Sequence, residues 1–144
     1  MKKLLFSRVF GFLVLAVAVL SVGARAEGVD SIDAAAKVAG SWLALVDNGQ
    51  YAGSWVQAAK LLKSQVSQPQ WEAAVKSARD AVGAEQTRVR YTANFARSLP
   101  GAPDGEYVVL TYNVAYVHKQ AAVETLTLMR EPDGAWRVAG YFLR

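Results

Sequence analysis

The stretch AAVETLTLMREPDGAWRVAGYFL, residues 121–143, decides the fold of this chain. Apolar and polar residues alternate on both sides of the Pro-Asp-Gly tripeptide at 132–134, which is typical of a tight turn. Alternation with a period of two indicates a strand that buries one of its faces. The stretch therefore predicts two antiparallel strands, at about 121–130 and 135–143, joined by a short turn.

A third strand is predicted just before this pair, at about 106–117, with a turn around Lys119. Pairing across both turns places the apolar residues of the three strands on one face. The expected partners are Leu128 with Val138, Leu126 with Gly140, Glu124 with Phe142, Leu110 with Leu128, Tyr112 with Leu126, and Val114 with Glu124. The expected core face consists of Val108, Leu110, Tyr112, Val114, Leu126, Leu128, Trp136, Val138 and Phe142.

A fourth strand is predicted at 88–95, where apolar and polar residues again alternate. Its apolar positions are Val89, Tyr91, Ala93 and Phe95. We expect Arg88 and Arg90 to lie on a solvated face. An anion-binding or nucleic-acid strip is the alternative, but no stacking aromatic residues interleave with the arginines. The segment 98–105 contains two prolines and two glycines, and we expect a rigid connecting loop there rather than a ligand-binding one.

The first half of the domain is predicted to be helical. Apolar residues between 30 and 46 recur with a period close to 3.6, and a second helix is expected at about 51–63. Ser67 and Gln70 have the spacing of a capping box, which opens a third helix that ends at Gly83. Helices followed by antiparallel strands predict an α+β fold, in which the N-terminal helices pack on a sheet of about four strands.

Residues 1–26 have the pattern of a secretory signal peptide. Two lysines precede an apolar run at 10–22, and a small-x-small cleavage site ends at Ala26. The run is shorter than the ~20 residues that a membrane-spanning helix needs. We therefore expect cleavage after Ala26, a single periplasmic or secreted domain at 27–144, and no membrane anchor after cleavage.

The charge of the chain is unevenly distributed. There are 16 Lys and Arg against 12 Asp and Glu, but four of the cations precede Glu27 and none of the acidic residues does. The predicted mature domain therefore has a formal net charge of zero. Since the domain lacks a basic excess, we expect no nucleic-acid partner.

Residue types that commonly perform catalysis or bind metals are scarce. The chain has no cysteine, and its one histidine, His118, falls at a predicted hairpin turn. Asp47, Asp104 and Asp133 lie in separate predicted turns, where turn chemistry accounts for them. We expect no metal site, no cofactor and no catalytic residue.

Glu124 is the ionisable residue that strand parity places among the apolar residues of the core face. A buried carboxylate without a partner is costly, so we expect a cation within reach. Arg79 borders the apolar stripe of the third predicted helix and is the expected partner. Two interpretations stay open. The pair orients the helix on the sheet, or it lines a cavity in which Glu124 is a general base or ligand anchor.

The opposite face of the predicted sheet is unusually apolar for a solvated surface. Its expected residues are Tyr107, Val109, Thr111, Thr125, Thr127, Met129, Ala139, Tyr141 and Leu143. We expect this face to bind a partner or a second copy of the chain. The expected interface residues are Tyr107, Thr111, Met129 and Tyr141.

The chain resembles the bacterial family known as domain of unknown function 4019. The resemblance rests on WLALVDNGQY at 42–51, Ser54-Trp55, LPGAPDGEY at 99–107 and DGAWRVAGY at 133–141. It extends from about Ile32 to Arg144 and implies no activity and no catalytic residues. The order of elements also resembles the cystatin-like or nuclear-transport-factor-2-like cone, which implies a curved sheet wrapped around helices.

Two functions follow as alternatives, because such folds host both enzymes and binding modules. The first is an exported, non-enzymatic domain that binds a protein or small molecule, or serves as an envelope accessory factor. The second is an enzyme or small-ligand carrier that uses a cavity between helices and sheet. Polar groups that face such a cavity would distinguish them, since an enzyme needs at least two positioned groups.

Overall fold

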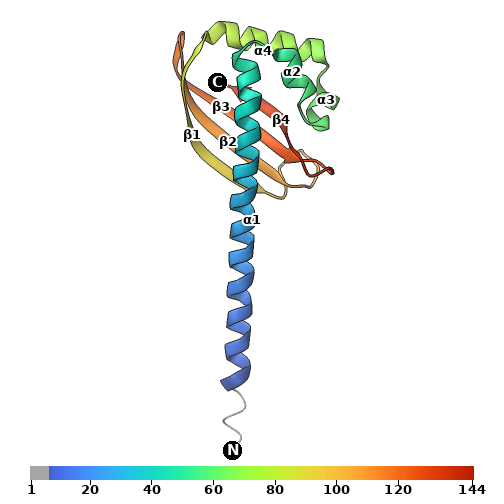
Figure 1. Ribbon diagram of the computed structural model, residues 1–144, viewed down its shortest axis with the longest axis vertical. Coiled ribbons are helices and arrows are strands. Elements are labelled where there is room, and N and C mark those ends of the chain that lie inside the picture. Colours follow the sequence, from blue (N-terminus) through green and yellow to red (C-terminus); the bar gives the residue numbers. More distant parts are fainter. Residues whose placement is uncertain (1–6) are drawn as a thin grey trace, which may run out of the picture.

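The computed structural model describes the backbone of residues 7–144, and the exposure of the residues is described for Gly23 and from Arg25 onward. Within these residues, helices precede strands: α1 (Ser7–Asp47), α2 (Tyr51–Val56), α3 (Lys60–Gln65), α4 (Gln68–Val82), β1 (Glu85–Ala96), β2 (Tyr107–Tyr116), β3 (Lys119–Arg130) and β4 (Trp136–Leu143). The strands form one antiparallel sheet in the order β1-β2-β3-β4 (Figure 1). The predicted α+β class is confirmed.

The sheet curves around the C-terminal half of α1, while the N-terminal part of that helix extends beyond the sheet (Figure 1). The helix α4 crosses one end of the sheet, and α3 lies beside β4. Apolar side chains fill the space between helices and sheet, because each element presents one apolar face to it. The largest fully buried side chains of this apolar core include Trp42, Val46, Val108, Leu110, Leu126, Leu128 and Val138.

The predicted signal peptide falls partly on the described chain. Residues 1–6 lie outside the described residues, and 7–26 form the N-terminal part of α1. Arg25 and Ala26 are exposed. Among the residues that the structure describes, no helix is both long and apolar enough to cross a membrane. Among the positions of α1 whose exposure the structure describes, Gly23 and those from Arg25 onward, the buried ones are Ser31, Ala35, Ala39, Trp42, Leu43 and Val46.

The prediction of one continuous helix at 51–63 is wrong, because α2 and α3 are separate. The backbone is extended at Ala59, and the Ala59 N–H donates to the Val138 carbonyl oxygen at 2.8 Å. The Lys60 N–H, at the start of α3, donates to the Glu131 carboxylate at 2.6 Å. Pairing with the edge of β4 thus replaces the helical hydrogen bonds at this point. The capping box of Ser67 and Gln70 at the start of α4 is confirmed.

Two details of the predicted strand pairing are corrected by the structure. The strands β2 and β3 pair with Leu110 opposite Leu126, two residues away from the expected partner, so the same side chains still face the core. The pairing of β3 with β4 shifts by one residue beyond Val138. Because of this irregularity, Tyr141 lies opposite Leu126, and Phe142 points outward with 62% of its surface exposed. The placement of Phe142 in the core is therefore wrong.

Irregularities in β1 also reverse part of its predicted orientation. The register with β2 shifts between Arg90 and Thr92, so the two halves of the strand differ in parity. After the shift, Ala93 and Phe95 pack against the core as predicted. Before it, Val89 is 65% exposed and the side chain of Arg88 is only 14% exposed. The expectation that Arg88 lies on a solvated face is therefore wrong.

Candidate functional site

Six polar side chains meet between the helices and the sheet. We call them the buried ionic cluster, and its members are Asp47, Arg79, Arg88, Tyr116, Glu124 and Tyr141. They come from the end of α1, from α4 and from all four strands of the sheet. Each strand contributes through the parity of its pleat, which turns these positions toward α1. The cluster therefore joins segments that are far apart in the sequence.

Glu124 is at the centre of the cluster and is fully buried. Its Oε2 accepts a hydrogen bond from Arg88 Nε at 2.6 Å, and its Oε1 lies 3.3 Å from Arg79 Nη1. The hydroxyl of Tyr141 donates to Oε1 at 2.7 Å, and the hydroxyl of Tyr116 donates to the same oxygen. The carboxylate thus has donors on both oxygens, which offsets the cost of removing its charge from water.

Asp47 connects the two arginines at the outer side of the cluster. Arg88 donates to it through Nη1 at 2.8 Å and Nη2 at 2.9 Å, and Arg79 Nη2 donates at 2.7 Å. The guanidinium of Arg79 also lies over the ring of Tyr116, with 4.9 Å to the centroid. Two carboxylates and two arginines leave the cluster electrically balanced, as a low-dielectric interior requires.

The protonation states follow from these contacts. Partial burial acts to raise the pKa of Asp47, but hydrogen bonds and positive charge from Arg88 and Arg79 outweigh it and lower the pKa below its ordinary value. Burial, together with the Glu124 carboxylate, raises the pKa of Tyr116 and Tyr141 far above the ordinary tyrosine value. At neutral pH Asp47 is therefore an anion and both hydroxyls are neutral donors.

An acid-induced loss of stability is expected from Asp47. Since its pKa is lower in the folded state, its contribution to stability is present above the unfolded-state pKa of about 3.8 and is lost as the pH falls through the folded-state value. Urea unfolding between pH 7 and pH 3 should show a smaller pH dependence for Asp47→Asn than for the wild type. The matched control is Asp80→Asn, which removes an exposed partner of Lys76. Equal slopes for wild type and Asp47→Asn would contradict the expectation.

The structure brings Glu124 and Arg79 together, and it adds four residues that sequence reasoning missed. The inward position of Arg88 depends on the bulge in β1, which has no signature in the residue types. The sequence predicts a turn at Asp47, whereas Asp47 is the last residue of α1 and its side chain is 25% exposed. The alternation of Tyr112, Val114 and Tyr116 could have predicted one of the four, because it extends the core face of β2 to Tyr116. The structure shows that Tyr116 is fully buried.

A pocket of about 380 Å³ adjoins the cluster on its outer side and is lined in part by Asp47, Tyr51, Arg79 and Asp80. Glu124 does not reach it. Within the described part of the chain, every buried side-chain nitrogen and oxygen has a hydrogen-bond partner. The cluster is therefore suited to fixing α1 and α4 on the sheet, since its groups already bind one another.

His118 lies at the tip of the β2–β3 hairpin and is exposed, beside the end of α4. The N–H groups of Val117 and His118 donate to the carbonyl oxygens of Ala84 and Val82. Gly83, with φ of 79°, has no room for a Cβ, because the imidazole Cδ2 would lie 2.8 Å away. The position of His118 is thus explained by packing of the hairpin on α4.

The face of the sheet away from α1, which we call the open face, differs from the expected one. Thr111 and Met129 lie on it and are partly exposed. Tyr107 is paired with Met129 and lies on the same face, but its ring is buried and its hydroxyl donates to the Pro103 carbonyl in the loop before β2. Tyr141 lies on the opposite face, toward α1, where its ring packs edge-on against Trp42 with 5.4 Å between the ring centroids. Neither tyrosine is therefore exposed on the open face.

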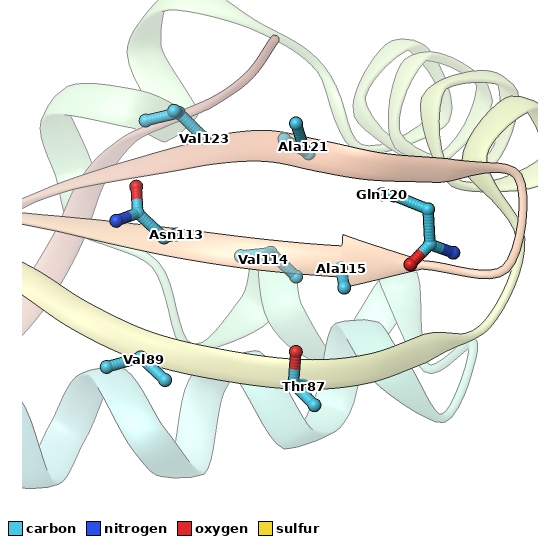
Figure 2. A pocket seen from close by; sticks show the side chains of 9 residues that line it. Thr87, Val89, Asn113, Val114, Ala115, Gln120, Ala121 and Val123 are labelled. Atoms are coloured by element: carbon cyan, nitrogen blue, oxygen red, sulfur yellow. The ribbon is translucent and has the colours of Figure 1, made fainter.

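A groove of about 370 Å³ crosses the open face over three strands. Figure 2 shows its side chains, which on β2 and β3 are mostly small. Those that point outward are Thr87 and Val89 on β1, Asn113 and Ala115 on β2, and Ala121 and Val123 on β3. The groove arises because Ala115 and Ala121 leave a depression between longer neighbours.

Fold and site together define the class of this protein: an α+β domain whose curved antiparallel sheet holds an ionic cluster against its covering helices. A family model described as "Protein of unknown function (DUF4019)" matches residues 38–141. This match covers most of the chain, and the protein therefore belongs to that family. All six residues of the buried ionic cluster lie within the matched range. The comparisons with curated proteins and with solved structures found no match.

Proposed function

We propose that this protein is an exported, non-enzymatic binding module that acts through its open face. The observation that carries the proposal is the composition of that face. The outward-facing residues at 109–115 of β2 and 121–129 of β3 are all uncharged, and the exposed side chains of Val89 and Phe142 flank them. A solvated surface of this extent ordinarily carries charges, so the uncharged face supports a role as a contact surface.

The interior supports the same proposal over an enzyme or a small-ligand carrier. Catalysis in the space between helices and sheet would need polar groups that are free to act on a substrate. The carboxylate of Glu124 is fully buried and already accepts hydrogen bonds from two arginines and two tyrosines. A substrate would have to displace these partners, so the cluster favours a structural role.

Export is supported by the pattern of residues 1–26 and by the contacts that α1 makes with the rest of the domain directly after Ala26. Glu27 forms an ion pair with Arg97 at 2.9 Å, and Gly28 lies beside Phe95. Cleavage after Ala26 would therefore leave the described packing of the domain intact.

Intact-mass measurement of protein from a periplasmic fraction tests export. We expect a mass that corresponds to a chain beginning at Glu27. A variant with Ala24→Leu and Ala26→Leu, which removes the small residues of the cleavage site, should accumulate uncleaved. Recovery of the full-length wild-type chain from the cytoplasm would contradict the proposal.

The binding surface is tested by photo-crosslinking in living cells. A photoreactive amino acid at Ala115, in the groove, should give discrete covalent adducts. The matched control places the same residue at Val56, which is 57% exposed but lies at the end of α2. Adducts from Val56 and none from Ala115 would show that the open face is not the contact surface.

A further inference from the structure

We propose that the occupant of the open face is a second copy of this chain, packed face to face about a two-fold axis. The inference rests on the proposed function in one respect, since it uses the same surface and names what covers it. Three features of the open face support it: its lack of charge, its self-complementary shape and its area.

The charge pattern favours an identical partner. A charged partner surface would lose water against the uncharged residues of β2 and β3 without gaining a counter-charge, which is unfavourable. Two copies of this face meet without like-charge repulsion. Arg137, the cation of β4 on this side, is held at one end of the strand by Asp133 at 2.8 Å and by Glu131 at 3.0 Å. It therefore borders the face and leaves its centre uncharged.

The shape of the open face supplies both halves of a two-fold contact. Phe142 projects from β4 with 62% of its surface exposed, opposite Thr125 on β3. The groove at Ala115 and Ala121 begins at Val123, the next outward residue of β3. A two-fold interface needs a projection and a matching depression on the same surface. When the two-fold axis passes between Phe142 and the groove, Phe142 of each copy enters the groove of the other.

The area of the face is sufficient for a specific but modest dimer. Four strands about 4.8 Å apart, with about 8 residues each at about 3.3 Å per residue, give roughly 500 Å² of projected surface per copy. The pair then buries about 1,000 Å², the lower limit for a specific interface. We therefore expect dimerisation that depends on protein concentration.

Pairing through a sheet edge is a weaker explanation. The register of β1 with β2 is irregular at two places, between Glu85 and Thr87 and between Arg90 and Thr92, and bulges of this kind oppose edge-to-edge pairing. The edge of β4 is already used by the Ala59 N–H, which donates to Val138. Because both edges oppose pairing, we favour face-to-face packing as the symmetric contact between two copies of the sheet.

Sedimentation velocity over a concentration series tests the proposal on protein purified from cells that express the full-length chain. The wild type should pass from monomer to dimer as concentration rises. Phe142→Glu should raise the dimer Kd by about 30-fold or more, the effect of losing a central apolar anchor. Ala121→Lys, in the groove, should do the same. The control Val56→Glu likewise replaces an exposed apolar side chain with a charged one but should leave the Kd unchanged.

Mixing the two face variants gives the sharpest test. In a mixed dimer, Phe142→Glu of one copy faces Ala121→Lys of the other, so that opposite charges meet, and the second contact keeps Phe142 and Ala121. The mixture should therefore dimerise at concentrations at which each variant alone is monomeric. Unchanged melting temperatures of the variants would show that they are folded.

The outcomes separate this inference from the proposed function. A wild type that stays monomeric at millimolar concentration, or a mixture that does not dimerise, overturns the second copy as the occupant. If Ala115 then still gives adducts with another protein, the binding module stands with a different partner. If Ala115 gives no adduct of either kind, the open face is not a binding surface and both proposals fail.

Discussion

Arg88→Met should lower the free energy of unfolding by about 3–5 kcal/mol, the typical cost of breaking a buried ion pair. The substitution keeps most of the aliphatic stem but removes the donors to Glu124 at 2.6 Å and to Asp47 at 2.8 and 2.9 Å. Two carboxylates would then share the single charge of Arg79. Urea unfolding followed by circular dichroism at pH 7 measures the loss.

The matched control is Arg90→Met, on the same strand. Arg90 is exposed, so its replacement should change stability by no more than about 0.5 kcal/mol. Equal effects at the two positions would show that Arg88 is not part of a buried cluster.

A double variant tests whether charge balance is the cause. Glu124→Gln alone should also be strongly destabilising and lower the melting temperature, because it leaves two arginines with one carboxylate. Combined with Arg88→Met, it restores balance and keeps an amide oxygen for the hydroxyls of Tyr116 and Tyr141. The double variant should therefore lose less stability than the sum of the two single losses. A loss of stability in the double variant equal to the sum of the two single losses would contradict coupling between Arg88 and Glu124.

Trp42→Ala should be the second large effect, at about 3–5 kcal/mol. Trp42 is 1% exposed, its indole N–H donates to the Ser54 carbonyl at 2.8 Å, and its ring contacts Trp71 and Tyr141. Truncation would create a cavity between α1 and β4 and remove the packing that supports Tyr141 beneath Glu124. Thermal unfolding followed by near-ultraviolet circular dichroism reports both effects.

Trp55→Ala is the comparison for this prediction. Its indole N–H also donates to a backbone carbonyl, that of Val66 at 3.0 Å, but the side chain is only partly buried. The loss should therefore be clearly smaller than for Trp42. A larger loss of stability for Trp55→Ala than for Trp42→Ala would contradict the position of Trp42 at the centre of the core.

Features that depend on local sequence were predicted well. The turn at 132–134, the capping box of Ser67 and Gln70, and the order of helices and strands each depend on contacts between residues close in the chain. Parity within a strand is also local, and it assigned Glu124 to the core from its alternation with Leu126 and Leu128.

Features that depend on pairing between strands were predicted less well. A register shift in β1 turned Arg88 inward, and another in β4 exchanged Tyr141 with Phe142 between the two faces. One extra residue in a strand reverses the parity of everything beyond it, whereas the residue types stay the same. Alternation therefore predicts each strand face only up to the nearest irregularity.

The sequence by itself determined the class of fold, the element order and the presence of a carboxylate among apolar residues, because periodicity and turn chemistry are properties of neighbouring residues. Only the tertiary structure decided which partners that carboxylate has. Asp47, Arg79 and Arg88 are separated by dozens of residues from Glu124, and they meet because the sheet curves around α1 and two strands shift register. Such contacts minimise the free energy of the whole chain, in which unpaired buried charges are excluded, and no local pattern encodes them.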